Sequence, residues 1–155
     1  MRLYLVQHAE ARKEEEDPDR PLTEKGWQDA RRVARYAIEW AGVRPSRVLH
    51  SGKLRAEQTT SVWEEHLAVV QVGQADGMDP IANPRIWADR LRHETEDLML
   101  VGHLPHLRRL ASLLLCGDDG QEVVAFENAG IVCLQGNPEG RWSLRWILTP
   151  AIVRP

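Results

Sequence analysis

Short apolar runs alternate with longer amphipathic segments along the first two thirds of this chain. The run Leu3–Val6 combines apolar, aromatic and β-branched residues and predicts a buried strand. From Glu24 to about Trp40, apolar residues recur at helical spacing. Thr23 suits the N-cap of this helix and Gly42 suits its end. The chain therefore begins as a strand followed by an amphipathic helix.

The same patterns predict the remaining elements. After the first helix, strands and helices continue to alternate, and the last part of the chain has the alternation of antiparallel strands. The expected strands are Arg47–His50, Val69–Val72, Asp97–Val101, Glu122–Phe126, Gly130–Leu134 and Trp142–Leu148; the expected helices are Leu54–Leu67, Pro84–His93 and Pro105–Leu115. This order predicts an α/β fold, a three-layer α/β/α sandwich with a mixed, mainly parallel sheet. One domain is expected over residues 1–155.

Composition and charge limit the classes of partner that the sequence predicts. The 155 residues carry a formal net charge of -3, which gives no reason to expect nucleic acid or an anionic membrane as a partner. No signal-peptide pattern and no apolar run of membrane-spanning length is visible, so we expect a cytoplasmic protein, a monomer or weak dimer. Cys116 and Cys133 both follow apolar residues and are interpreted as buried small hydrophobes without a disulfide.

Polar side chains follow three of the predicted strands at the point where each strand ends. Gln7 and His8 follow the first, Ser51 follows the second, and His103 comes after Val101-Gly102. The carboxyl ends of strands in open α/β sheets are where ligands bind. These residues are therefore expected to line one polar pocket.

The residue types in this pocket suit phosphoryl transfer. A neutral imidazole is a nucleophile near pH 7, so His8 is a candidate to attack phosphorus. Arg55, in the first turn of a helix, adds a guanidinium to the backbone N–H groups that favour phosphate there. His103, as imidazolium, would supply a hydrogen bond and charge to a transferring phosphoryl group. Taken singly, His8 is better explained as a structural histidine and Arg55 as a surface arginine, and the alternative for His103 is a histidine at a helix entry.

Two further patterns could indicate a binding site, but each also has a purely structural explanation. His103 and His106 have a spacing that could place both on one face of a helix, with His8 or His50 completing a metal site, but no carboxylate or cysteine ligand pair accompanies them. Trp142 and Trp146 are four apart in a predicted strand and should share one face as packing residues.

Five motifs, taken together and in this order, resemble the histidine phosphatase superfamily, and within it the small phosphohistidine phosphatases of the SixA type. They are Leu3-Tyr4-Leu5-Val6-Gln7-His8-Ala9-Glu10, Arg20-Pro21-Leu22-Thr23-Glu24-Lys25-Gly26, Ser51-Gly52-Lys53-Leu54-Arg55-Ala56-Glu57-Gln58-Thr59, Val101-Gly102-His103-Leu104-Pro105 and Trp146-Ile147-Leu148-Thr149-Pro150. The resemblance implies a phosphorylated nucleophile at His8. It implies that Arg55 and His103 hold the phosphoryl oxygens, that Arg20 reaches over the phosphate, and that no metal or cofactor is needed.

The first motif departs from the family, whose usual Arg-His-Gly is Gln7-His8-Ala9 here. Gln7 can still donate to a phosphoryl oxygen, but a charge-assisted hydrogen bond contributes about 1.5–3 kcal/mol against about 0.5–1.5 for a neutral one. That deficit corresponds to turnover slower by roughly tenfold. We interpret this as a variant active site.

The small number of candidate general acids bears on the class of substrate. Asp79 is the only candidate in its loop for a general acid, and Asp76 and Asp89 flank it at greater distance. Phosphohistidine has a better leaving group than an alkyl ester and needs less acid help. The expected function is a metal-independent phosphohistidine phosphatase acting on a protein, for which the resemblance implies a histidine-containing phosphotransfer domain. A small-molecule phosphomonoesterase, or a phosphate-binding module of little activity because of Gln7, stays open.

Overall fold

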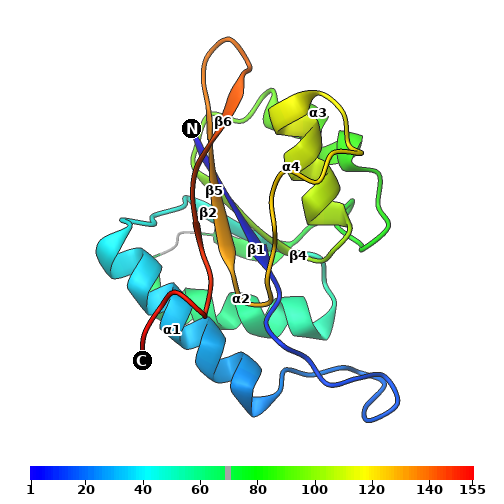
Figure 1. The fold of residues 1–155 in the computed structure, drawn as a ribbon, viewed down its shortest axis with the longest axis vertical. Coiled ribbons are helices and arrows are strands. Elements are labelled where there is room, and N and C mark those ends of the chain that lie inside the picture. The colour runs from blue at the N-terminus through cyan, green and yellow to red at the C-terminus, as the bar shows by residue number, and fades with distance from the viewer. Residues whose placement is uncertain (69–70) are drawn as a thin grey trace.

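The computed structural model describes residues 1–68 and 71–155 and shows strands alternating with helices before a final hairpin (Figure 1). The strands are β1 Arg2–Gln7, β2 Arg47–His50, β3 Gln71–Gln74, β4 Leu98–Gly102, β5 Ile131–Gly136 and β6 Trp142–Leu148; the helices are α1 Glu24–Trp40, α2 Leu54–His66, α3 Pro84–Leu91 and α4 His106–Cys116. No helix in the described ranges is long and apolar enough to cross a membrane.

The strands form one six-stranded sheet in the order β3-β2-β4-β1-β5-β6. The β2–β3, β2–β4 and β1–β4 pairs are parallel, whereas β5 and β6 join by antiparallel pairing. β1 lies in the middle, with Leu5 opposite Leu100 of β4 and Val132 of β5. The sheet is therefore mixed and mainly parallel, as the sequence predicts.

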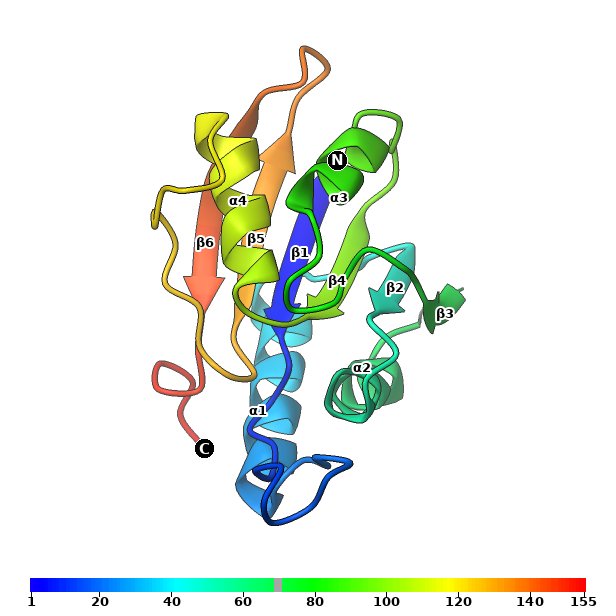
Figure 2. The ribbon, with the colours of Figure 1, turned by 90° about the vertical axis from the view of Figure 1, so that its right-hand side faces the viewer.

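Helices cover both faces of this sheet. Tyr4 and Val6 point toward the α1 and α2 side, and Leu3 and Leu5 toward the α3 and α4 side, so β1 is buried on both faces. Figure 2 shows α3 and α4 in front of the strands and α1 behind them. The predicted three-layer α/β/α sandwich is confirmed, and its two cores explain why residues 3–6 of β1 and the whole of β4 contain only apolar or aromatic residues.

The start of α1 explains the motif around Gly26. Thr23 caps the helix, and its hydroxyl accepts from the Gly26 N–H at 3.0 Å. A Cβ at position 26 would lie 2.2 Å from the Glu10 carbonyl oxygen, so only glycine allows this approach. The contact fixes the segment after His8 against the first turn of α1.

One predicted strand is absent. Glu122–Phe126 has no strand conformation, although Val124 is buried against α3 and α4. Its alternating apolar residues pack under the helix layer while the segment returns from α4 to β5, and this packing accounts for a pattern that resembles a strand. The other elements differ from prediction by a few residues: α3 ends at Leu91 rather than His93, and β3 begins at Gln71. The predicted strand residues Val69 and Val70 lie outside the described residues.

The expectation that Trp142 and Trp146 share a face is wrong. Opposite the Cys133–Leu134 step of β5, the pairing skips a residue of β6, because Leu134 pairs with Leu144 and Cys133 pairs with Trp146. This irregularity inserts an extra residue and reverses the alternation. Trp142 therefore packs on the α3 and α4 side, and Trp146 on the α1 and α2 side.

The two cysteines differ from each other. Both are free thiols, but Cys116, at the end of α4, is exposed and only Cys133 is buried. The prediction of two buried cysteines is wrong for Cys116, the last residue of α4, which does not join Leu114 and Leu115 in their contact with the core.

Candidate active site

Three strand ends bring His8, Ser51 and His103 together at one edge of the sheet. β1 and β4 are neighbours, and the His8 N–H donates to the Gly102 carbonyl at 3.0 Å. The centroids of the His8 and His103 rings are 5.0 Å apart. Ser51, which follows β2, has its hydroxyl oxygen 2.6 Å from Nε2 of His103. The parallel order of β2, β4 and β1 thus brings these three side chains together, as the sequence predicts.

His8 is held with one nitrogen available for chemistry. Its Nδ1 lies 2.8 Å from the Ala9 carbonyl oxygen, which is only an acceptor, so Nδ1 carries the proton and Nε2 keeps its lone pair. The pKa of His8 is lowered to about 4, chiefly by burial; the hydrogen bond to the Ala9 carbonyl acts in the opposite direction, and Arg55 and Arg20 contribute to the lowering. The imidazole is therefore neutral and nucleophilic at pH 7.

The Ser51 contact orients His103. The Ser51 oxygen accepts from the Lys53 N–H at 3.3 Å, so its own hydrogen is free to donate to Nε2 of His103. Nδ1 of His103, which is buried without a partner among the described residues, then carries the proton. Burial lowers the pKa of His103 to about 3, with smaller effects of His8 and Arg55. The lowered pKa makes His103 a neutral donor in this structure, whereas the sequence-based expectation is an imidazolium in contact with a phosphoryl group.

Arg55 and Arg20 supply the positive charge. Arg55 lies in the first turn of α2, whose start is not capped by a side chain. Burial lowers the pKa of Arg55, and Arg20 lowers it further, which places the two guanidinium groups within each other's field. Arg20 has a left-handed backbone with φ of 51°, and its Nε donates to the Arg12 carbonyl at 3.0 Å. Two cations thus act on His8 from α2 and from the loop before α1.

Three amide or hydroxyl side chains brace this arrangement. Thr59 accepts from the Ala9 N–H at 2.9 Å, and Gln58 accepts from the Leu22 N–H at 2.8 Å. From the opposite side, Asn128 donates to the His8 carbonyl at 2.9 Å. Sequence reasoning placed Thr59 and Gln58 inside a motif without giving them a role, and it missed Asn128. A polar residue just before a predicted strand was the only signal for it.

The three candidate general acids pair with lysine or arginine side chains rather than with His8 or His103. Asp79 is exposed, and its nearest charged partner is Lys53 with 4.0 Å between carboxylate oxygen and Nζ. Asp76 pairs with Arg90 and Asp89 with Arg92, both on the α3 side. Among the described residues, no carboxylate shifts the pKa of His8 or His103. Within residues 1–68 and 71–155, no three His, Cys, Asp or Glu side chains gather as metal ligands.

The sequence of residues 3–85, more than half of the chain, matches the family model of the histidine phosphatase superfamily, branch 1. The chain belongs to the histidine phosphatase superfamily. No curated protein sequence matches it.

Solved structures resemble this superfamily member over nearly its whole length. The protein histidine phosphatase SixA, complexed with tungstate, is 22% identical with a TM-score of 0.87, and the match covers 99% of this chain and 100% of SixA. SixA of Agrobacterium tumefaciens is 27% identical with a TM-score of 0.79, covering 96% and 97%. An Escherichia coli K-12 protein assigned as an alpha-ribazole-5'-P phosphatase is 17% identical with a TM-score of 0.77, covering 98% of each chain. The superfamily and its SixA neighbours support a phosphatase.

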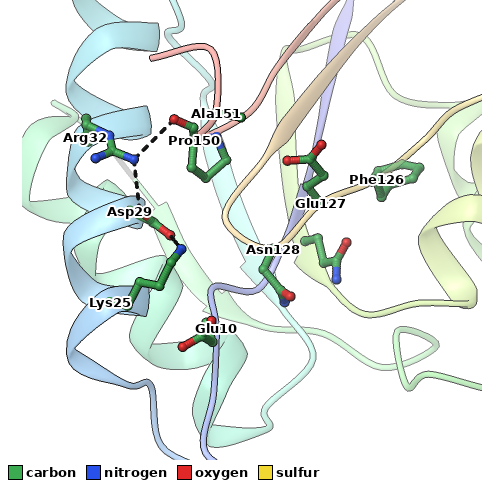
Figure 3. A pocket seen from close by; sticks show the side chains of 10 residues that line it. Glu10, Lys25, Asp29, Arg32, Phe126, Glu127, Asn128, Pro150 and Ala151 are labelled. Carbon is green, nitrogen blue, oxygen red and sulfur yellow. Dashed lines mark hydrogen bonds and ion pairs between the residues drawn. The ribbon is translucent and has the colours of Figure 1, made fainter. Parts of the chain in front are cut away.

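A cavity of about 550 Å³ lies beside the His8 pocket (Figure 3). Gln7, the residue before the candidate nucleophile, is in its wall. The cavity is otherwise lined by Glu10, Lys25, Asp29, Arg32, Phe126, Glu127, Asn128, Pro150 and Ala151. Sequence reasoning did not foresee it, because its walls come from four separate segments.

His106 is fully buried and lies close enough to His103 to lower the pKa of that imidazole. Neither ring nitrogen of His106 has a hydrogen-bond partner among the described residues. Its pKa is lowered to about 4, chiefly by burial and to a smaller extent by Arg109, against an opposing effect of Asp79. A buried polar group without a partner costs about 1–3 kcal/mol. Replacing it with an apolar residue of similar size removes that cost.

His106→Leu is therefore expected to raise the free energy of unfolding by about 1–3 kcal/mol at pH 7. Urea denaturation measures this change. His93→Leu, in the exposed turn after α3, is the matched control and should change stability by less than about 0.5 kcal/mol. A loss of stability in His106→Leu would show that the imidazole makes a bond that the structure does not display.

Proposed function

We propose that this chain is a metal-independent phosphohistidine phosphatase that acts on phosphorylated proteins through a phospho-His8 intermediate. The observation that carries the proposal is the state of His8. Its Nδ1 is engaged by the Ala9 carbonyl, its pKa is lowered to about 4, and two guanidinium groups act on it. A neutral nucleophile next to fixed positive charge is the arrangement that phosphoryl transfer requires.

The reaction follows from these positions in two steps. Nε2 of His8 attacks phosphorus, the P–N bond to the substrate imidazole breaks, and the departing nitrogen keeps the electron pair and takes a proton from solvent. Water then attacks the phosphorus of phospho-His8, which releases inorganic phosphate and restores the Nε2 lone pair. Arg55, Arg20 and the Nδ1–H of His103 stabilise the charge on the phosphoryl oxygens in both steps.

The exposed position of Asp79 favours phosphohistidine as the substrate. An alkoxide leaving group needs a placed acid, whereas an imidazole leaves without one. Asp79 is exposed and lies nearest to Lys53 rather than to either imidazole. Its closeness to Lys53, which borders Ser51, is also the observation that keeps a phosphomonoesterase with Asp79 as general acid as the second candidate.

Asp79→Asn separates the two candidates. For a phosphohistidine phosphatase, we expect release of phosphate from a phosphohistidine-bearing protein, in the presence of EDTA, to change by less than about threefold, because no acid step is lost. Hydrolysis of a phosphoserine peptide should be slower by at least about 100-fold in both forms. Efficient hydrolysis of the phosphoserine peptide by the wild type, lost in Asp79→Asn, would favour the phosphomonoesterase instead.

A further inference from the structure

We propose that Thr59 is a positioning residue for His8: its hydroxyl sets the backbone geometry that leaves Nε2 of His8 free to attack phosphorus. Thr59 lies on α2 and is fully buried, so it acts through its neighbours rather than on the substrate. The inference rests on the proposed function and names the side chain on which the state of the nucleophile depends.

The Thr59 hydroxyl makes two hydrogen bonds, and the partners settle their directions. The Arg55 carbonyl can only accept, so it takes the hydroxyl hydrogen, with 2.7 Å between the two oxygens. The lone pairs of the hydroxyl oxygen remain, and one of them accepts from the Ala9 N–H at 2.9 Å. A single side chain therefore connects the residue after the nucleophile to the first turn of α2, which carries Arg55.

The peptide between His8 and Ala9 is held on both sides. Thr59 binds the N–H of this peptide, whereas its carbonyl, which belongs to His8, accepts from Nδ2 of Asn128 at 2.9 Å. Ala9 is fully buried, and within the described part of the chain its N–H has no acceptor other than Thr59. Because an unpaired buried N–H is costly, this peptide has one favoured orientation as long as the Thr59 hydroxyl is present.

The next residue fixes the other side of Ala9. The Glu10 carbonyl accepts from the Thr23 N–H at 2.9 Å, so the backbone is held before and after Ala9. The Ala9 carbonyl between these two points reaches Nδ1 of His8 at 2.8 Å and keeps the imidazole proton there. If the bond to Thr59 is lost, this carbonyl is less well fixed. The imidazole can then place its proton on Nε2, where it blocks attack on phosphorus.

Thr60 shows which of the two Thr59 contacts is special. Thr60 is 2% exposed, and its hydroxyl donates to the Ala56 carbonyl at 2.9 Å, four residues earlier, as the Thr59 hydroxyl does to Arg55. Both threonines thus form the same bond within α2, but only Thr59 also binds Ala9. Thr60→Val removes a buried hydroxyl from the same helix without touching the turn at His8, and it is the matched control for Thr59→Val.

The tautomer of His8 tests the proposal without any catalysis. Nitrogen NMR of protein with labelled histidine distinguishes a protonated ring nitrogen from one with a free lone pair. At neutral pH we expect the His8 proton on Nδ1 in the wild type, in Thr59→Ser and in Thr60→Val, and a measurable fraction on Nε2 in Thr59→Val. A Thr59→Val spectrum equal to that of Thr60→Val would overturn the proposal. So would a wild-type His8 protonated on Nε2, an outcome that needs no variant to fold.

A kinetic comparison then connects the tautomer to the reaction. On a phosphohistidine-bearing protein, Thr59→Val should lower kcat by about tenfold, the factor to which the loss of one neutral hydrogen bond corresponds. KM should change by less than about twofold, because the guanidinium groups that meet the phosphate are retained. Thr59→Ser should restore the rate, and Thr60→Val should match the wild type.

The remaining outcomes separate this inference from the proposed function. A loss of rate shared by Thr60→Val, or Thr59→Ser as slow as Thr59→Val, would show a general effect of packing in α2 and contradict the positioning role, while the phosphatase function stands. If the wild type does not hydrolyse the substrate but the His8 tautomer changes only in Thr59→Val, the proposed function fails and the positioning role stands.

Discussion

His8→Ala is expected to lower the rate of phosphate release from a phosphohistidine substrate by about four orders of magnitude or more, the scale seen when a catalytic nucleophile is removed. The reason is geometric. Of the two imidazoles that meet at this sheet edge, His8 is the one whose Nε2 is left free by a fixed Nδ1 contact, whereas Nε2 of His103 is engaged by Ser51. His103 therefore lacks the free, oriented lone pair that would let it replace His8.

The measurement has a covalent component as well as a rate. A brief incubation with labelled phosphohistidine substrate, stopped in alkali, should leave acid-labile phosphate on the wild-type chain and none on His8→Ala. His66→Ala, an exposed histidine at the end of α2, is the control and should keep both the rate and the label. Label that persists in His8→Ala would place the intermediate on another residue and contradict the mechanism.

Much of the candidate site could be read from the sequence because it depends on strand ends. A parallel sheet places the residues after β1, β2 and β4 at one edge whatever the details of their packing. His8, Ser51 and His103 consequently meet, as predicted. Arg55 follows from the same logic, since α2 begins immediately after the β2 end.

Features that depend on side-chain environment could not be read in this way. The irregular pairing between β5 and β6 places Trp146 on the opposite face from Trp142. No residue type in β6 indicates this irregularity. The charge of His103 depends on burial and on the nearby His8 and Arg55, and both require the three-dimensional arrangement. The segment 122–126 has strand-like alternation, yet its apolar residues are satisfied by the helix layer.

Gln7 shows how one substitution connects to distant segments. In the sequence, Gln7 indicates only the loss of a positive charge from a phosphate-binding site. In the structure the same side chain borders a cavity with Glu10 and Glu127, which come from segments more than a hundred residues apart. Two cations, Arg55 and Arg20, still act on His8. The lost charge is thus compatible with phosphate binding.

The buried imidazoles predict that the fold loses stability in mild acid. The pKa values of His8, His103 and His106 are lowered to about 4, 3 and 4, whereas an unfolded histidine has a pKa of about 6.5. Between those values the unfolded chain binds more protons than the folded one, so the free energy of unfolding falls as the pH falls below about 6.5. Each pKa unit corresponds to about 1.4 kcal/mol, and three groups together amount to several kcal/mol.

Urea denaturation at pH 7.5, 6 and 5 measures this loss above the range where most carboxylates titrate. The decline should be shallower in His106→Leu, which removes one of the three buried groups, and unchanged in His93→Leu, whose imidazole is exposed. Stability that stays level from pH 7.5 to 5 would mean that the imidazoles are protonated in the folded state. Activity should follow a different course, because His8 with a pKa of about 4 is still neutral at pH 5. Below pH 6 the protein is therefore expected to become easier to unfold while the molecules that remain folded keep their nucleophile.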